Sequence, residues 1–189
     1  GMNFATESFS NPNWAYGHSD WKYINAVHKK FGETQLRTFP HFNFLFLFYI
    51  NIVRRVRIVS LLNYIEYNKD TAKDLLKREL GWQDYGGKHF ESIYTRFFQG
   101  VVLPQKFGID KRYGHFSDLI NAGQMSKEKA KSLLALPTYD TKLQREDRAY
   151  VIKKLRFSEE QFENIMRLPL RTFRDYPNSY SFVQFLRNG

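Results

Sequence analysis

Two glycine-containing stretches hold most of the side chains that could do chemistry. The first runs from Tyr85 to Gln99 and places Gly86 and Gly87 directly before Lys88 and His89. Adjacent glycines let a backbone approach a ligand closely, and the N-terminus of a following helix presents unpaired N–H groups to an anion. Lys88 and His89 are therefore candidate contacts at the mouth of an anion site.

The helix expected after these glycines, Glu91–Val102, carries a mixed polar face. Glu91, Thr95 and Gln99 follow one another at intervals of four residues and so fall on one side of a helix. An acid, a hydroxyl and an amide side by side suit a binding site. A polar stripe at this spacing is equally typical of a solvated face, so both interpretations stay open.

The second stretch, Lys106 to Ser117, is a basic loop with glycines at 108 and 114. Arginine offers two-pronged hydrogen bonding and lysine a point charge, so Lys111 and Arg112 could clamp a phosphate or carboxylate. The alternative is an exposed loop with a surface pair between Asp110 and Arg112, which would contribute little to stability.

Several kinds of site are excluded. The chain has no cysteine, so it holds no disulfide, thiolate zinc site, iron–sulfur cluster or cysteine nucleophile. It lacks the GxxxxGK[ST], GxGxxG, HExxH and GxSxG motifs, and its five histidines show no metal-ligand spacing. We therefore expect no catalytic metal.

The net charge of +10 is unevenly placed, since residues 53–189 contain 25 of the 29 bases and 16 of the 19 acids. An anion is expected to bind there. The many aromatic and basic residues raise the possibility of nucleic-acid binding, but no RNP-type motif or basic helical stripe is present. The pattern favours a small anionic ligand over a polymer.

Helix starts and stops recur along the chain and predict a mainly α fold. We expect a single irregular helical domain of about seven to nine helices, with little or no sheet; only Gln35–Phe39 and part of Phe44–Ser60 suggest strands. The expected helices are a Ser19-capped helix to Phe31, then Asp70–Leu80, Glu91–Val102 (ended by Pro104), His115–Asn121, Lys127–Ala135, Glu146–Leu155 and Glu159–Leu168, the last with a Ser158–Gln161 capping box.

The apolar run Phe42–Val53 is too short for the roughly 20 residues that a membrane-spanning helix needs. It predicts a buried helix or strand. The alternative is a membrane-surface helix, because Arg54, Arg55 and Arg57 follow it directly. The first residues have neither the basic nor the apolar region of a secretory signal, which predicts a cytoplasmic protein.

The residues from Asn63 to Pro177 resemble the N-acetyl sugar amidotransferases of lipopolysaccharide (LPS) and O-antigen biosynthesis. The likeness covers over half of the chain and rests on an ordered series of short motifs. They are Gly81-Trp82, Tyr85-Gly86-Gly87-Lys88-His89-Phe90-Glu91-Ser92, Tyr94-Thr95-Arg96-Phe97-Phe98-Gln99-Gly100, Leu103-Pro104, Lys106-Phe107-Gly108-Ile109-Asp110-Lys111-Arg112, His115, Ser117, Gly123-Gln124-Met125 and Asp175-Tyr176-Pro177.

This resemblance implies chemistry like that of asparagine-synthase-type ATP pyrophosphatases. Such enzymes adenylate a sugar-linked acetamido group, and ammonia from a separate glutaminase subunit then displaces AMP to leave an acetamidino group. The implied substrate is an N-acetyl sugar carried on a nucleotide diphosphate. ATP with magnesium is the implied cofactor.

The family binds ATP through a Ser-Gly-Gly-Lys-Asp-Ser loop with cysteine motifs ahead of it, and this chain contains neither. We therefore expect it to correspond to the C-terminal helical half, with no cofactor bound to this chain alone. Residues 1–60 would continue from an ATP-binding half, and residues 61–189 would form a substrate or partner domain in one compact unit with them.

The resemblance also suggests roles for individual residues. His89 and Glu91 are the candidate catalytic residues, for acid–base work or for orienting the acetamido group. The candidate substrate contacts are Lys88, Thr95, Arg96, Gln99, Asp110, Lys111, Arg112, His115 and Ser117, with Asp110 orienting Arg112. For Asp110, Thr95 and Ser117, helix capping or local pairing is an equal alternative.

A second function stays open beside that of an amidotransferase portion. The chain could be a noncatalytic interaction module that docks the glutaminase or a separate ATP-binding subunit. The missing ATP loop is compatible with either hypothesis, so whether this chain takes part in catalysis is left undecided by the sequence.

Overall fold

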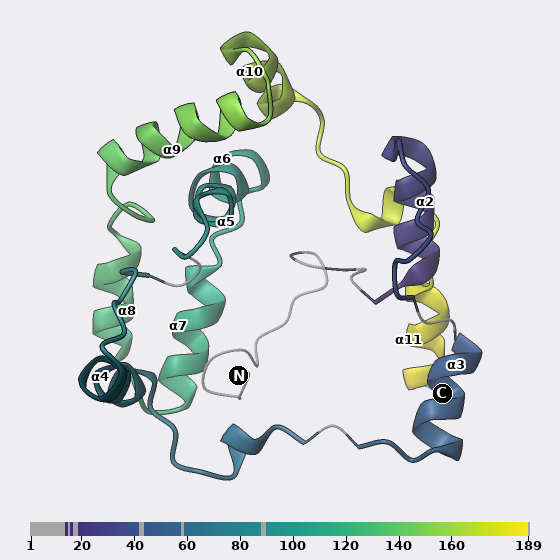
Figure 1. Ribbon diagram of the computed structural model, residues 1–189, viewed down its shortest axis with the longest axis horizontal. Coiled ribbons are helices and arrows are strands. Elements are labelled where there is room, and N and C mark those ends of the chain that lie inside the picture. Colours follow the sequence, from purple (N-terminus) through teal and green to yellow (C-terminus); the bar gives the residue numbers. More distant parts are fainter. Residues whose placement is uncertain are drawn as a thin grey trace. The chain divides into compact units, whose positions relative to one another are not determined.

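The computed structural model describes residues 14, 16, 19–41, 44–57, 59–87 and 90–188 (Figure 1). The regular structure in this part of the chain is helical and contains no β-strand. Among the described residues there are nine helices when the continuous runs 44–53 and 93–107 are each counted once and the two 3₁₀ turns are left out. The predicted mainly α fold is confirmed, and the strands suggested for Gln35–Phe39 and within Phe44–Ser60 are wrong.

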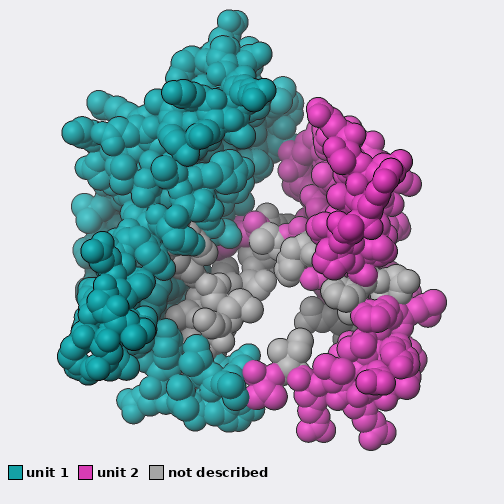
Figure 2. Space-filling model, in the orientation of Figure 1, with its two compact units in different colours: residues 1–9, 60–170 teal, residues 10–59, 171–189 magenta. Residues whose placement is uncertain are grey.

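The chain divides into two compact units (Figure 2). Unit 1 comprises residues 1–9 and 60–170, and unit 2 comprises residues 10–59 and 171–189. The helices of unit 1 are α4 (Lys69–Leu80), α5 (Ile93–Phe97), α6 (Leu103–Phe107), α7 (Arg112–Asn121), α8 (Lys127–Leu134), α9 (Thr141–Lys154) and α10 (Glu159–Arg167), with a 3₁₀ turn η2 (Leu61–Asn63). Those of unit 2 are α2 (Trp21–Phe31), α3 (Phe44–Phe48) with the π-helical η1 (Tyr49–Val53), the 3₁₀ turn η4 (Phe173–Asp175) and α11 (Tyr180–Asn188).

Most helix boundaries follow from capping residues visible in the sequence. Ser126 caps α8, and Ser158 caps α10 in a complete capping box with Gln161, as predicted. Gly81 ends α4 with a φ of +61°, a left-handed conformation that glycine adopts without strain. Helix α2 differs in detail, because Asp20 and not Ser19 accepts the hydrogen bond of its first turn.

Two further helices begin earlier than the sequence predicts. Helix α7 starts at Arg112 instead of His115, and α9 starts at Thr141 instead of Glu146. The Asp140 carboxylate accepts a hydrogen bond from the backbone N–H of Leu143 at 2.8 Å. This cap satisfies one of the exposed donors at the start of α9 and therefore moves its first turn upstream.

Pro104 does not end the helix that contains it. The chain continues from α5 through a π-helical turn, η3 (Phe98–Val102), into α6 without a break. Proline has no N–H, and in an α-helix that N–H would bond to the carbonyl of Gly100. The Thr138 hydroxyl donates to this carbonyl instead, at 2.6 Å. The predicted stop at Pro104 is therefore wrong, because a distant side chain satisfies the exposed acceptor.

Gly100 also allows close packing at the same turn. A Cβ atom added there would lie 2.5 Å from the Tyr139 ring, closer than real carbon atoms approach. The helix can therefore receive the ring of Tyr139 only because residue 100 has no side chain. Thr138 and Tyr139 together connect the middle of the long helix to the segment that leads into α9.

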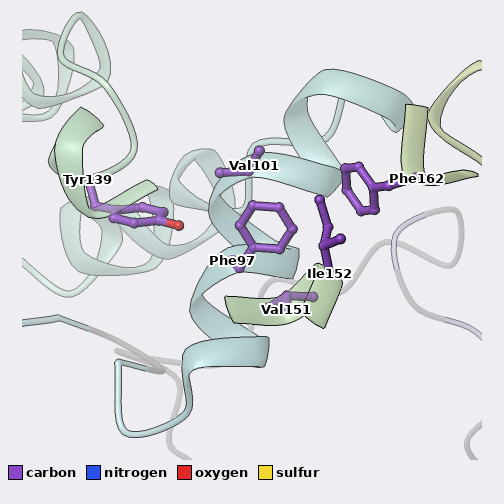
Figure 3. Packing of buried hydrophobic residues seen from close by; sticks show 6 residues of the cluster. All are labelled: Phe97, Val101, Tyr139, Val151, Ile152 and Phe162. Carbon is purple, nitrogen blue, oxygen red and sulfur yellow. The ribbon is translucent and has the colours of Figure 1, made fainter. Parts of the chain in front are cut away.

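The core of unit 1 is centred on Phe97, of which only 1% is exposed. Figure 3 shows Phe97 amid side chains from four parts of the chain. These are Val101 from η3, Val151 and Ile152 from α9, Phe162 from α10, and Tyr139. Burial of such large apolar side chains stabilises a fold by roughly 1.5–3 kcal/mol each. Helices α5, α9 and α10 are thus joined by one apolar cluster.

Unit 2 is organised around the Asp20 carboxylate. It accepts hydrogen bonds from the Tyr16 hydroxyl at 2.7 Å, from the backbone N–H of Ser179 at 2.6 Å and from that of Tyr23 at 3.2 Å. It therefore caps α2 and also holds Ser179, which precedes α11. The Tyr16 ring packs on Phe173 with the ring centroids 4.2 Å apart. A negative charge near two helix N-termini is favourable because of the helix dipoles.

These contacts make unit 2 sensitive to acid. Burial acts to raise the pKa of Asp20, but hydrogen bonds from Tyr16, Ser179 and Tyr23 outweigh it and hold the pKa below its usual value. The stabilising effect is therefore present above the unfolded-state pKa of about 3.9 and is lost as the pH falls through the lower folded-state pKa.

We predict that Asp20→Asn lowers the free energy of unfolding by about 1–2 kcal/mol at pH 7 and flattens its dependence on pH below about 5. Urea denaturation between pH 2.5 and 7 measures both effects. Glu33→Gln, an exposed acid in the same unit, is the matched control. Equal pH dependence in Asp20→Asn and the parent would contradict this role of Asp20.

Candidate functional site

The residues predicted to form a site lie in unit 1, from the segment before α5 to the middle of α7. Lys88 and His89 fall outside the described residues, so their predicted roles stay predictions. The remaining candidates lie just before α5, on α5 and η3, just before α7 and on α7.

Glu91 does not lie on the helix that carries Thr95. Ser92 caps that helix, and its hydroxyl accepts the Thr95 N–H at 3.3 Å, so the first helical residue is Ile93. Gln99 lies one turn further on in the π-helical η3, where the wider turn alters the α-helical register. The predicted shared face of Glu91, Thr95 and Gln99 is therefore wrong. Thr95 and Gln99 are half-buried, and Glu91 is exposed.

Arg96 makes an almost fully enclosed polar contact in unit 1. Its Nε and Nη2 atoms donate to Oδ2 and Oδ1 of Asp147 on α9, each at 2.7 Å. The two side chains are only 12% and 4% exposed. The guanidinium carbon also lies 5.2 Å from the ring centroid of Phe90 and 5.8 Å from that of Tyr139. One edge of this guanidinium is thus bound by the Asp147 carboxylate, and two aromatic rings lie close to it.

The electrostatics agree with a tightly held ion pair. The hydrogen bond that Arg96 donates to Asp147 raises the pKa of Arg96 despite the opposing effect of burial. Burial and the neighbouring Asp147 carboxylate raise the pKa of the Tyr139 hydroxyl. Arg96 therefore stays charged and Tyr139 stays neutral at physiological pH, which suits a structural ion pair between α5 and α9.

The Arg112 guanidinium, like that of Arg96, is hydrogen-bonded to other groups of the protein. Its Nε and Nη2 atoms donate to the Asp110 carboxylate at 3.0 and 2.7 Å, so the predicted pairing of these two residues is present. Its Nη1 atom donates to the carbonyls of Leu133 and Leu136, each at 3.0 Å. These carbonyls lie in the last turn of α8 and just beyond it, where helical partners are lacking. Arg112 thus caps the C-terminus of α8.

Lys106 caps a second helix. Its Nζ atom donates to the carbonyls of Ile165 at 2.7 Å, Met166 at 3.1 Å and Leu168 at 2.8 Å, at the end of α10. A positive charge there also complements the negative end of the helix dipole. The basic segment from Arg96 to Arg112 therefore holds three later helices through three cations.

The other predicted substrate contacts are Lys111, Ser117 and His115, which lie at the start of α7 and within it. Lys111 is half-buried at the start of α7, and no ion pair joins it to another described residue. Ser117 donates its hydroxyl to the Tyr113 carbonyl at 2.7 Å, a local bond within α7. His115 is half-buried on the same helix, with its Nδ1 atom shielded from solvent. Among the predicted cations that the structure describes, Lys111 is the one left for a ligand.

Unit 2 contains a pocket that sequence reasoning missed. It is open, has a volume of about 450 Å³, and is lined by Lys22, Asn25, Ala26, Lys29 and Lys30 of α2 with Asp175, Tyr176 and Pro177. The signal was the spacing of Lys22, Asn25 and Lys29, which repeats along one helix face. The backbone N–H of Thr172 lowers the pKa of Asp175, so the pocket carries three positive charges against one negative charge.

The described residues do not fit magnesium-bound ATP. No group of three or more histidine and acidic side chains in this part of the chain could hold a metal ion. The Ser-Gly-Gly-Lys-Asp-Ser loop is absent from the sequence, and the carboxylates of Asp110 and Asp147 are each paired with an arginine. We therefore assign no step of a reaction to ATP bound by this chain.

A family model described as "LPS biosynthesis protein WbpG-like, C-terminal domain" matches residues 91–187, just over half of the chain. The chain belongs to this family. The match begins at Glu91 and takes in Arg96, Asp147 and both capping cations, while Lys88 and His89 precede it. No curated protein and no solved structure matches the sequence.

The family region therefore coincides with the cation-held helices of unit 1 and extends through Asp175 and Tyr176 of unit 2. It supports a role in LPS biosynthesis. Helices in the described part of the chain are all too short or too polar to cross a bilayer.

We predict that removing either capping cation loosens the helix end that it contacts. Arg112→Met should speed amide hydrogen exchange at Leu133 and Leu134, and Lys106→Met should do so at Ile165 and Met166, each by about tenfold. Hydrogen exchange followed by mass spectrometry or NMR measures the rates.

Each variant serves as the control for the other, and the exposed Lys129→Met on α8 controls for loss of charge. Uniform acceleration throughout unit 1, or no change at either helix end, would contradict the capping roles.

Proposed function

We propose that this chain is the C-terminal portion of an N-acetyl sugar amidotransferase of LPS and O-antigen biosynthesis. In this role it contributes binding of a nucleotide-diphosphate sugar to the ATP-dependent conversion of an acetamido to an acetamidino group. The family match over residues 91–187 carries the proposal, because it places the chain in LPS biosynthesis. The ordered motifs between Asn63 and Pro177 support the finer assignment.

The contacts within unit 1 indicate which of the predicted cations can bind the diphosphate of a substrate. The guanidinium groups of Arg96 and Arg112 already bind carboxylates and carbonyls of the protein, so a diphosphate would have to displace those partners. Lys111 has no such partner among the described residues. It is half-buried at the start of α7. We therefore assign the first contact with the diphosphate to Lys111.

The lysine pocket of unit 2 is the second place where a diphosphate could bind. Lys22, Lys29 and Lys30 bring three charges to one open pocket beside the Tyr176 ring. An aromatic ring next to cations suits a nucleotide, since the base can stack while the phosphates are neutralised. Substitutions at Lys111 and in the pocket show which of these two sites binds the diphosphate.

We predict that the parent chain binds UDP-N-acetylglucosamine, used as a representative nucleotide sugar, at low salt. Lys111→Gln should weaken this binding by about five- to tenfold, the effect of losing one ionic contact at a partly exposed site. Isothermal titration calorimetry at 20 and 150 mM NaCl measures the affinity. Lys127→Gln, at an exposed lysine of α8, is the control.

A loss of affinity in Lys22→Gln/Lys29→Gln but not in Lys111→Gln would move the diphosphate contact to unit 2 and leave the proposed function intact. Absence of any binding by the folded parent chain would contradict nucleotide-sugar binding by this portion. The missing ATP loop also leaves open a noncatalytic docking module. Adding a separate ATP-binding subunit distinguishes the two hypotheses, because a catalytic portion should then support AMP release and a docking module should not.

A further inference from the structure

The apolar segment of unit 2 is not buried as the sequence predicts. Residues 44–53 form α3 and η1 (Figure 1). Leu45 is 75% exposed and Val53 is 60% exposed. Phe46, Phe48, Tyr49 and Ile52 are also exposed. Phe42 and Asn43, which begin the predicted run, lie outside the described residues. A contiguous apolar surface of this kind marks a binding surface.

The charges around this helix are of one sign. Arg54, Arg55 and Arg57 follow it directly, and all three are exposed. The sequence contains no aspartate or glutamate from Thr34 to Ile65. The exposed apolar side chains are therefore followed directly by three arginines, and this part of the sequence contains no acid to offset their charge.

This combination identifies the kind of surface that the helix fits. Ten residues rise only about 15 Å as a helix, so the segment can lie in a bilayer interface but cannot cross it. Aromatic and aliphatic side chains enter the boundary between headgroups and acyl chains, while arginines bind lipid phosphates. The same segment in a second copy of the chain contains no acid that could pair with the three arginines, whereas an anionic lipid surface supplies negative charge.

We propose that residues 44–57 dock the protein onto an anionic lipid surface. The exposed apolar side chains of α3 and η1 insert into the interface, and Arg54, Arg55 and Arg57 contact the lipid phosphates. Neither signal is strong alone, since stable peripheral binding generally needs an apolar insertion together with a basic cluster. This docking does not depend on the sugar chemistry proposed above.

Vesicle co-sedimentation of the full chain tests the proposal. We expect binding to phosphatidylcholine vesicles that contain 30% phosphatidylglycerol and little binding to pure phosphatidylcholine. Raising the NaCl concentration from 50 to 500 mM should weaken the binding, because salt screens the arginine contacts. Replacing all three arginines by glutamine should weaken it by about fivefold per arginine. Leu45→Asp/Phe48→Asp should reduce it at least tenfold.

Matched controls come from unit 1. Leu80→Asp changes a leucine that is also 75% exposed, and Lys127→Gln/Lys129→Gln/Lys131→Gln removes three exposed charges from α8. Both should bind vesicles as the parent does. Phe48→Trp adds a direct probe, since its fluorescence emission should shift to the blue on anionic vesicles and stay unchanged on neutral ones. Circular dichroism establishes that each variant is folded.

Three results would overturn the proposal. These are equal binding to neutral and anionic vesicles, equal losses in the segment variants and their controls, and an unshifted Phe48→Trp emission. A parent dimer that Leu45→Asp/Phe48→Asp dissociates, without vesicle binding, would likewise overturn it and assign the apolar surface to a second copy of the chain.

Discussion

The Arg96–Asp147 ion pair is the interaction on which unit 1 depends. Both groups are nearly buried, and the two parallel hydrogen bonds at 2.7 Å connect helices 51 residues apart in sequence. A buried charge is costly unless it is paired, so neither partner can be lost without exposing the other to this cost. The rings of Phe90 and Tyr139 lie beside the guanidinium, and Phe97, next to Arg96, lies at the centre of the apolar core. The ion pair and the apolar core therefore both join α5 to α9, through the adjacent residues Arg96 and Phe97.

Lys106 and Arg112 extend the same principle toward the other helices. Arg96 binds the Asp147 carboxylate of α9. Lys106 binds the terminal carbonyls of α10, and Arg112 binds those of α8. A basic segment that first suggests a phosphate clamp therefore serves to assemble the helices that follow it. Among the predicted cations that the structure describes, this division leaves Lys111 for an anionic substrate, in addition to the lysines of the α2 pocket. Part of the net positive charge thus has a structural explanation, and the rest is available for ligands and surfaces.

Local chemistry was readable in the sequence, whereas contacts between distant segments were not. Ser126, the Ser158–Gln161 capping box and the Asp110–Arg112 pair involve neighbours two to three residues apart, so spacing alone predicts them. Arg96 and Asp147 carry no local signal of their pairing. Pro104 is a strong helix stop by itself, and only the Thr138 hydroxyl, 38 residues away from Gly100, explains why the helix continues. The apolar run at 44–53 was expected to be buried because its side chains are apolar. The sequence does not show whether another segment of the chain covers them.

A double-mutant cycle on the Arg96–Asp147 pair tests the central claim most directly. The variants are Arg96→Met, Asp147→Leu and the two combined, and urea denaturation measures the free energy of unfolding of each. Each single change leaves a buried charge without its partner and is expected to cost about 3–5 kcal/mol, while the double variant costs less than the sum by at least about 2 kcal/mol. Additive costs, or single changes each below about 1 kcal/mol, would show that this ion pair does not hold the unit together.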